Sequence, residues 1–381
     1  MPSVPYELLQ LIADDVEDES LPNLRLASRT LNSVATPLVF RVVTVHDSVR
    51  SAEALSGLQS CDKSVTNAVQ ELIFKGDPEE DTMISVSEEP GRDALARAFS
   101  RLGNLSNLVH LRFDFHQYFE EDELWTVSEN PSHFLRLQLG IFRALAENPI
   151  PALVSLTLNN VIGVPDYIHG EDGFLDIFQQ LKTLSISVIY EGYYCYPPIG
   201  QFWDGSVRYI LDNAVSLTSL TLRSDEPVGV QPALSFENAL MPYLKSLSLH
   251  NFALDPTVPE YDVVEFIICH KRTLTQLTLD ECSIDGGSIG DGQNAHFDRP
   301  WGAVLRRFEA ELSALQMFSL TNGASRDVED SPRDPRFCYT YEEPGFGYIT
   351  IDYGEVVGEE DDEAALESLM ATVEARRTHR C

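Results

Sequence analysis

A six-residue pattern that recurs nine times is the feature that most constrains the fold of this 381-residue chain. Each copy has an apolar residue at its first, fourth and sixth positions, as in the segment from Leu153 to Leu158. The copies begin at residues 69, 108, 153, 181, 217, 244, 274, 315 and 346. Because the fourth and sixth positions are two apart, they point to one face of a strand. The sequence therefore predicts nine short strands arranged as the repeats of a solenoid.

Most intervals between the copies hold an apolar stretch with helical spacing, at 94–102, 134–146, 207–211, 263–269 and 301–312. The repeating unit is therefore predicted to be a helix, a turn and a strand. One such unit cannot bury its own apolar faces, but stacked units share a continuous core with parallel inner strands. The pattern over residues 46–354 resembles the leucine-rich repeat of the long, irregular kind, which implies a right-handed α/β solenoid.

The first 45 residues have a different character, with apolar stretches at 4–13 and 20–41 that predict three short helices. Ser20 is expected to cap the second helix and Pro37 to end the third. So short a segment cannot bury all of its apolar side chains, so some should stay exposed or be covered by a partner. The alternative is that these helices only cap the first repeat, as the end of a solenoid requires.

Three motifs follow one another in this segment. A Val-Pro pair precedes Glu-Leu-Leu-x-x-Ile, and then come Leu-x-Leu-x-Ser-Arg-x-Leu-Asn and Ala-x-Pro-Leu-x-Phe-Arg. Their order over residues 3–41 resembles the F-box, which binds the Skp-type adaptor of a cullin-RING ubiquitin ligase. The resemblance implies adaptor contacts at Val4, Pro5, Leu8, Leu9, Ile12, Leu24, Leu26, Ser28 and Leu31. The family usually has Leu at the position of Val4 and Trp at that of Leu31, so we expect weaker binding without its loss.

An F-box followed by leucine-rich repeats resembles the substrate receptor of an SCF ubiquitin ligase, a component of ubiquitin-dependent protein degradation. Such a receptor is no enzyme: it holds the target protein beside the conjugating enzyme and so raises the effective concentration of the target's lysines. The resemblance thus implies two partners, a Skp-type adaptor with its cullin-RING ligase and an unidentified target protein. The rival interpretation is a repeat scaffold that binds a protein partner without ubiquitin chemistry.

The residue between the last two apolar positions of each copy should point to solvent on the inner strands. Seven of these nine residues carry hydroxyls, the set being Ile73, Arg112, Thr157, Ser185, Thr221, Ser248, Thr278, Ser319 and Thr350. Small hydroxyl side chains also suit a close parallel sheet, so packing alone can explain them. Charged residues at and beside this row are the expected target contacts: Arg112, Asp114, Arg223, His250 and Asp280.

Aromatic residues gather in the interval from 190 to 209, which supplies a second set of expected target contacts. Rigid aromatic side chains with a polar tip are favoured binding anchors. The candidates are Tyr193, Tyr194, Tyr196 and Trp203. The alternative is that these side chains cover an end or an edge of the solenoid.

The charge of the chain argues against nucleic acid and membrane partners. With 60 acidic and 27 basic residues the net charge is −33, which repels phosphate backbones and anionic lipids. No apolar run approaches the roughly 20 residues of a membrane span, and the first residues lack a secretory signal. The six cysteines are scattered without a regular framework. We therefore expect an intracellular protein, in the cytoplasm or nucleus, with reduced thiols.

No motif predicts an enzyme, a cofactor or a metal site. The segment Gly286–Gly290 matches the Gly-x-Ser-x-Gly of serine hydrolases, but the preceding strand ends near Leu279 and no helix pattern follows. The nine histidines show no metal-ligand spacing. Residues 355–381 form an acidic stretch and a predicted helix at 364–377, which is expected to cap the far end of the repeats.

Overall fold

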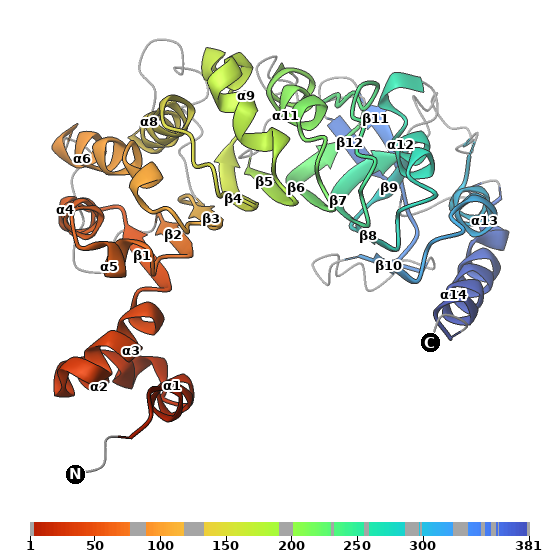
Figure 1. Cartoon of the computed structure of the whole chain (residues 1–381). Helices are drawn as coiled ribbons and strands as arrows, with labels where there is room; N and C mark the ends of the chain where they lie inside the picture. The colour runs from red at the N-terminus through yellow and green to blue at the C-terminus, as the bar shows by residue number, and fades with distance from the viewer. Residues whose placement is uncertain are drawn as a thin grey trace. The chain divides into compact units, whose positions relative to one another are not determined.

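The computed structural model describes residues 4–76, 89–117, 133–189, 201–229, 232–254, 259–285, 297, 299–322, 334–343, 347–351, 356 and 358–378. The chain divides into two compact units, which Figure 1 shows in a continuous colour ramp. The first consists of residues 1–119, 126–160 and 172–177, and the second of residues 120–125, 161–171 and 178–381. Both are mixed α/β structures whose strands are mostly parallel.

The first unit begins with three helices, α1 (Tyr6–Asp14), α2 (Leu21–Ala27) and α3 (Arg29–Val39). Its strands pair in parallel in the order β1 (Val42–His46), β2 (Glu71–Lys75), β3 (His110–Asp114) and β4 (Ser155–Ile162). Its other helices are α4 (Val49–Gln59), α5 (Lys63–Thr66), α6 (Glu89–Phe99), α8 (His133–Glu147) and most of α9 (Asp172–Gln179). In Figure 1, α4, α6 and α8 lie along one side of β1–β3.

The second unit has five parallel strands in the order β5 (Thr183–Ile189), β6 (Ser219–Val228), β7 (Ser246–Leu254), β8 (Gln276–Asp280) and β10 (Met317–Thr321). Its helices are α11 (Arg208–Asn213), which follows a π-helical turn at Phe202–Val207, α12 (Val263–Cys269), α13 (Trp301–Glu311) and α14 (Asp362–Thr378). The far end of β7 also pairs with β9 (Ser283–Asp285), which continues to β11 (Cys338–Glu343) and β12 (Gly347–Thr350). Short 3-10 turns lie at Asp18–Ser20, Leu102–Asn104, Tyr167–Gly170, Pro259–Tyr261 and Glu359–Asp361.

The three apolar positions of the six-residue pattern form the strand side of the core, beside buried residues of the helices. Each of the nine predicted segments contains a strand. In the first eight copies, from Val69 to Leu320, all three apolar positions are buried, and the leading residue is at most 2 % exposed. That leading residue lies in the turn before the strand, as predicted, because the strand itself begins two residues later. The eight strands in these copies are all parallel to their neighbours within each unit.

Two expectations about local structure are wrong. The ninth copy forms β12, which pairs antiparallel with β11. Only residues 344–346 join these two strands, and a parallel pair would need a crossover of about a dozen residues. Pro37 does not end the third helix, since α3 continues to Val39 and the amide of Phe40 still bonds the carbonyl of Thr36 at 3.2 Å.

The sheet of the second unit divides at a left-handed residue in β7. Asn251 has φ of 63°, and the residues after it are all buried. Before this point β7 pairs with β8 through His250, and beyond it Ala253 pairs with Ser283 of β9. Glu281, which follows β8, takes the same conformation with φ of 53°. The kink thus redirects β7 from one sheet to a second, smaller one.

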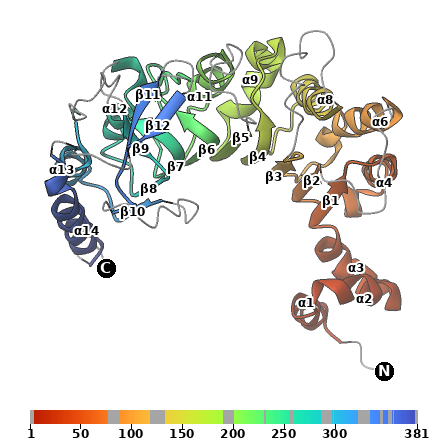
Figure 2. The ribbon, with the colours of Figure 1, turned by 180° about the vertical axis from the view of Figure 1, so that it is seen from behind.

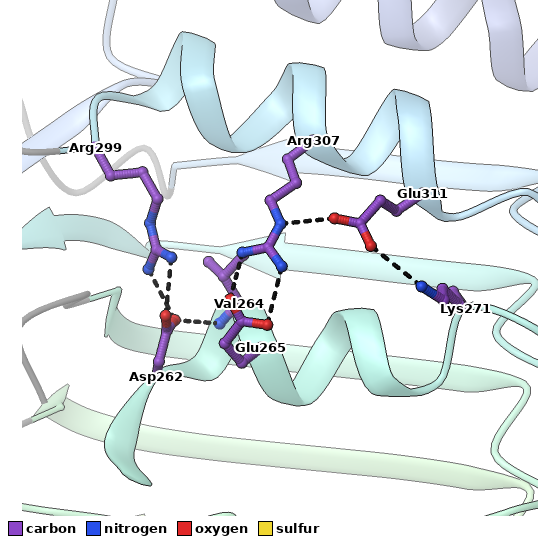
Figure 3. Close-up of polar contacts among 7 residues, drawn as sticks. All are labelled: Asp262, Val264, Glu265, Lys271, Arg299, Arg307 and Glu311. Atoms are coloured by element: carbon purple, nitrogen blue, oxygen red, sulfur yellow. Dashed lines mark hydrogen bonds and ion pairs between the residues drawn. The ribbon is translucent and has the colours of Figure 1, made fainter. Parts of the chain in front are cut away.

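Ion pairs hold α12 against α13 (Figure 3). The guanidinium of Arg299 donates to both oxygens of Asp262 at 2.8 and 2.7 Å, and Asp262 also caps α12 by accepting from the amide of Val264. One turn along, Arg307 bridges Glu265 of α12 and Glu311 of its own helix. Because Asp262 is buried, we attribute more of the attachment to this pair than to the exposed one at Arg307.

The predicted C-terminal helix is present as α14, which begins two residues earlier than expected and packs beside α13 (Figures 1 and 2). Its first residue, Asp362, is buried and accepts hydrogen bonds from the amide of Gly302 at 2.6 Å and from the hydroxyl of Tyr339 at 2.5 Å. Burial raises the pKa of Asp362 to about 6, although both hydrogen bonds act to lower it.

Asp362→Asn tests this raised pKa. The pKa of an unfolded Asp is about 3.9, so the folded state binds its proton more tightly, and this contribution to stability is lost as the pH rises from about 4 through about 6. Asn does not titrate. Between pH 4 and 7, the unfolding free energy of the wild type should fall by about 1–3 kcal/mol relative to that of the variant, as measured by urea denaturation. Asp361→Asn, at an exposed neighbour, is the control; parallel pH profiles for Asp362→Asn and the wild type would contradict the assignment.

Asn251→Ala and Asn251→Gly test the kink in β7. Both remove the side chain, but only glycine adopts φ of 63° without steric cost. We expect the alanine variant to be less stable than the glycine variant by about 1 kcal/mol in chemical denaturation. The same pair at Ser248, on the regular part of β7, should show the opposite order, and an identical order at both positions would refute the argument.

Candidate functional site

Six large side chains of the first unit lie on the surface of α1–α3 and its entry, each between 50 % and 80 % exposed. They are Val4, Tyr6, Leu8, Leu11, Ile12 and Leu26, and we call them the N-terminal apolar surface. Singly exposed apolar residues are ordinary on proteins, but six within 23 residues of sequence are not. The expectation that part of the apolar set stays uncovered is therefore confirmed for this segment.

The interior that holds α1–α3 together is small. Its buried apolar residues are Ala13, Leu21, Val34 and Ala35. Ser28 accepts from the amide of Leu31 at 3.2 Å and so caps α3, whereas Ser20 makes no side-chain cap. Arg25 donates to the hydroxyl of Thr36 at 3.1 Å. The Arg25–Thr36 hydrogen bond thus links α2 to α3 beside this small apolar interior, while the six exposed apolar side chains lie outside it.

The nine expected adaptor contacts all lie between Val4 and Leu31, and none of them is fully buried. Six are exposed, namely Val4, Pro5, Leu8, Ile12, Leu26 and Ser28, and three are half-buried, namely Leu9, Leu24 and Leu31. Sequence reasoning missed Tyr6 and Leu11, although both lie between expected contacts on α1. Their exposure widens the apolar area beyond the residues that the motif implies.

The outward positions of the second unit form rows across its strands. Pairing aligns Ser185, Thr221, Ser248, Thr278 and Ser319, so the hydroxyl residues expected on β5–β8 and β10 do stand side by side. Two residues further along, the register aligns a second set, Arg223, His250, Asp280 and Thr321, which we call the charged row. Three of its four members were expected target contacts; Thr321 was missed, although it follows Leu320 as Asp280 follows Leu279.

The charged row is bonded internally. His250 Nδ1 lies 2.9 Å from Asp280 Oδ2, and the hydroxyl of Thr321 donates to Asp280 Oδ1 at 2.6 Å. Burial, the largest influence, acts to raise the pKa of Asp280, but these two hydrogen bonds and the charges of His250 and Arg223 outweigh it and hold that pKa below its usual range. Arg223, which is also paired with Ser187 of β5, is exposed. A partner at this row would therefore meet the exposed guanidinium of Arg223 and the carboxylate of Asp280, which its hydrogen bonds hold in place and partly neutralise.

The other two expected target contacts pair with each other in the first unit. Arg112 Nε donates to both oxygens of Asp114 at 2.8 and 3.0 Å. Asn159 of β4 adds a hydrogen bond to Asp114 at 2.7 Å. Side-chain hydrogen bonding to Asp114 raises the pKa of Arg112 further above its ordinary value. The structure therefore brings these residues together as a local polar cluster, with Arg112 exposed.

The aromatic candidates do not form a site among the described residues. Tyr193, Tyr194 and Tyr196 lie outside them. Trp203 is fully buried, with its ring edge-on to Phe252 at a centroid distance of 6.0 Å. It is a core residue of the second unit, because the turn before α11 points it inward. We therefore withdraw Trp203 as a target contact.

The described residues hold no arrangement typical of catalysis. Ser206 Oγ lies 2.9 Å from His169 Nδ1, but both are buried, and burial lowers the pKa of His169 to about 4. Burial also raises the pKa of Cys269 to about 11 and that of Cys282 to about 12, so neither thiol is an activated nucleophile. The Gly286–Gly290 motif lies outside the described residues.

The described residues contain no group of three or more His, Cys, Asp or Glu side chains that could hold a metal ion. None of their helices has the length and apolar character needed to cross a bilayer. Cys61, Cys269, Cys282 and Cys338, which are among them, are free thiols.

Comparison with known proteins adds no family assignment. No protein-family model matches the chain, and no curated protein matches it. Function must therefore be argued from the N-terminal apolar surface and the outward rows of the sheets.

Asp280→Asn tests the charged row. At pH 7 the variant should lose about 1–2 kcal/mol of unfolding free energy, because it weakens the hydrogen bonds from Thr321 and His250 to a charged acceptor. Because the pKa of Asp280 is lowered in the folded state, its ionised form stabilises the fold above the unfolded pKa of about 3.9, and this stability is lost as the pH falls through the folded pKa. The difference in unfolding free energy between the wild type and the variant should therefore narrow below about pH 4. Glu237→Gln, an exposed carboxylate of the same unit, is the control; a gap independent of pH would show that Asp280 is not held ionised.

Proposed function

We propose that this chain is the substrate receptor of an SCF-type ubiquitin ligase, with α1–α3 as an F-box that binds a Skp-type adaptor and residues 46–354 as a leucine-rich-repeat solenoid that binds a target protein. The observation that carries the proposal is the N-terminal apolar surface: six large apolar side chains stay exposed on helices whose sequence follows the order of the F-box. The chain supplies no catalytic group in this role, because the target is only held near the conjugating enzyme.

Energetics favour a bound partner on this surface. Fully burying one large apolar side chain contributes about 1.5–3 kcal/mol. Each of the six is half exposed or more, so covering even part of the set yields enough free energy for a specific interface. A helical cap, by contrast, would turn its large apolar residues toward the repeats. In α1–α3 the buried apolar residues are only Ala13, Leu21, Val34 and Ala35, whereas Leu26 is 80 % exposed.

The fold supports the repeat part of the proposal. Within each unit, the strands of the first eight copies of the pattern are parallel neighbours, and their equivalent apolar positions are buried in the same register. Such a sheet presents outward rows that differ in charge from strand to strand. Arg112 with Asp114 in one unit, and Arg223 with the charged row in the other, are the residues we assign to target contact.

Co-expression with a Skp-type adaptor tests the proposed function. We expect a 1:1 complex in size-exclusion chromatography, and Leu8→Glu together with Ile12→Glu should weaken binding at least about 100-fold, because each places a charge in an apolar contact. Both positions are about half exposed, so the folded state should tolerate the changes. Met370→Glu, a partly exposed apolar residue of α14, is the matched control and should leave adaptor binding unchanged.

Two outcomes would overturn the proposal. One is a folded wild-type protein that never co-elutes with the adaptor. The other is a complex that survives Leu8→Glu and Ile12→Glu unchanged, since the interface would then lie elsewhere. The first result favours the rival scaffold, which binds a protein partner through its repeats without ubiquitin chemistry; the second removes α1–α3 as the adaptor-binding element.

A further inference from the structure

At the amino ends of β5–β7, exposed apolar residues stand between two lysines. Leu240 is 69 % exposed and Tyr243 is 59 % exposed, and both lie in the turn before β7. Val215 is exposed in the turn before β6. Lys182 and Lys245 immediately precede β5 and β7. We call these five residues the amino-end surface; all belong to the second unit.

Backbone pairing fixes the spacing of the two lysines. The carbonyl of Lys182 accepts from the amides of Thr218 and Ser219, and the carbonyl of Thr218 accepts from the amide of Lys245. Lys182 and Lys245 are thus separated by one strand, and their backbones are about 10 Å apart at the usual strand spacing. The ring of Tyr243 reaches to 5.8 Å from the ammonium of Lys182. A cation and an aromatic face therefore share one surface.

Buried neighbours in the chain hold Leu240 and Tyr243 of this surface in place. Ala239 and Met241, on either side of Leu240, are at most 2 % exposed, and Leu244 is fully buried. The amide of Leu244 bonds the carbonyl of Met241 at 3.0 Å. Because Ala239, Met241 and Leu244 are buried, Leu240 and Tyr243 lie on the outside. The surface is therefore pre-organised, which lowers the entropy lost when a partner binds.

Charge identifies the kind of partner. The whole chain carries −33 and contains five lysines, yet two of them stand here in equivalent positions. Among the described residues no carboxylate pairs with Lys182 or Lys245, whereas Lys271 pairs with Glu311 at 3.3 Å. Both lysines are exposed. In a protein that repels anions as a whole, unneutralised ammonium groups around apolar anchors fit a carboxylate-bearing ligand.

We propose that the amino-end surface binds an extended acidic peptide segment of a partner protein, with an apolar side chain on Leu240 and Tyr243 and carboxylates on Lys182 and Lys245. Residues of an extended chain advance about 3.3 Å each, so carboxylates three residues apart match the separation of the two lysines. The apolar residue between them meets the aromatic ring. This inference does not depend on adaptor binding by α1–α3, because it uses none of the same residues.

The test uses the full-length protein and a fluorescein-labelled peptide with the sequence Glu-Leu-Phe-Glu between Gly-Ser flanks, followed by fluorescence anisotropy at low salt. We expect saturable binding below about 1 mM, the range of a single short anchor. Lys182→Glu with Lys245→Glu should weaken it at least about tenfold, because attraction becomes repulsion. Tyr243→Ala should also weaken it. Circular dichroism and urea denaturation check that each variant is folded.

Lys63→Glu with Lys75→Glu is the matched control, since it reverses the charge of two exposed lysines of the first unit and changes the net charge by the same amount. It should bind the peptide within about twofold of the wild type. Absence of saturation up to 1 mM overturns the proposal, as does equal binding by both double variants. Equal binding of a Lys-Leu-Phe-Lys peptide would also overturn it, because contact would then not depend on carboxylates.

Discussion

Strand register is the constraint on which the rest of this structure depends. In the second unit, Leu222, Leu249 and Leu279 are opposite one another and fully buried. A slip of one residue between any two strands would turn that leucine row out to solvent and bring hydroxyl side chains into the core. The cost of such a slip fixes the outward rows as firmly as the buried ones. Packing of the core thus determines the position of every surface residue on these strands.

The charged residues at the two ends of these strands differ in how strongly they are bonded within the fold. At the charged row, Asp280 is bonded by both its neighbours, so most of its charge serves the fold. At the amino ends, Lys182 Nζ donates to the carbonyl of Ser216 at 3.4 Å, and neither Lys182 nor Lys245 pairs with a carboxylate of the described residues. Bonded charges have lost part of their hydration and gain little from a new partner. Exposed lysines that lie beside apolar side chains and pair with no carboxylate of the described residues can still gain from a negatively charged partner.

Sequence periodicity predicted what is set locally and missed what is set by tertiary packing. The helix expected at 263–269 matches α12 because Val263, Phe266 and Ile267 repeat with helical spacing and Asp262 caps them. By contrast, β9 has three residues and exists only through pairing with β7 and β11, so no periodic signal marks it. For the candidate sites, the sequence motif correctly located the exposed N-terminal helices. The burial of Trp203 and the closeness of Lys182 and Lys245 could not be predicted, because both depend on how segments distant in sequence pack and pair.

The N-terminal helices have a small apolar interior, which leaves their large apolar side chains exposed for contact with a partner. With small or few residues inside, such as Ala13 and Ala35, α1–α3 gain little stability from their own packing. Contacts between α3 and α5 tie the cluster to the rest of the first unit. That attachment lets the large side chains, including Leu11 and Leu26, remain outside without the segment unfolding. Attachment to the rest of the first unit thus leaves the apolar residues of α1 and α2 exposed, as the proposed receptor function requires.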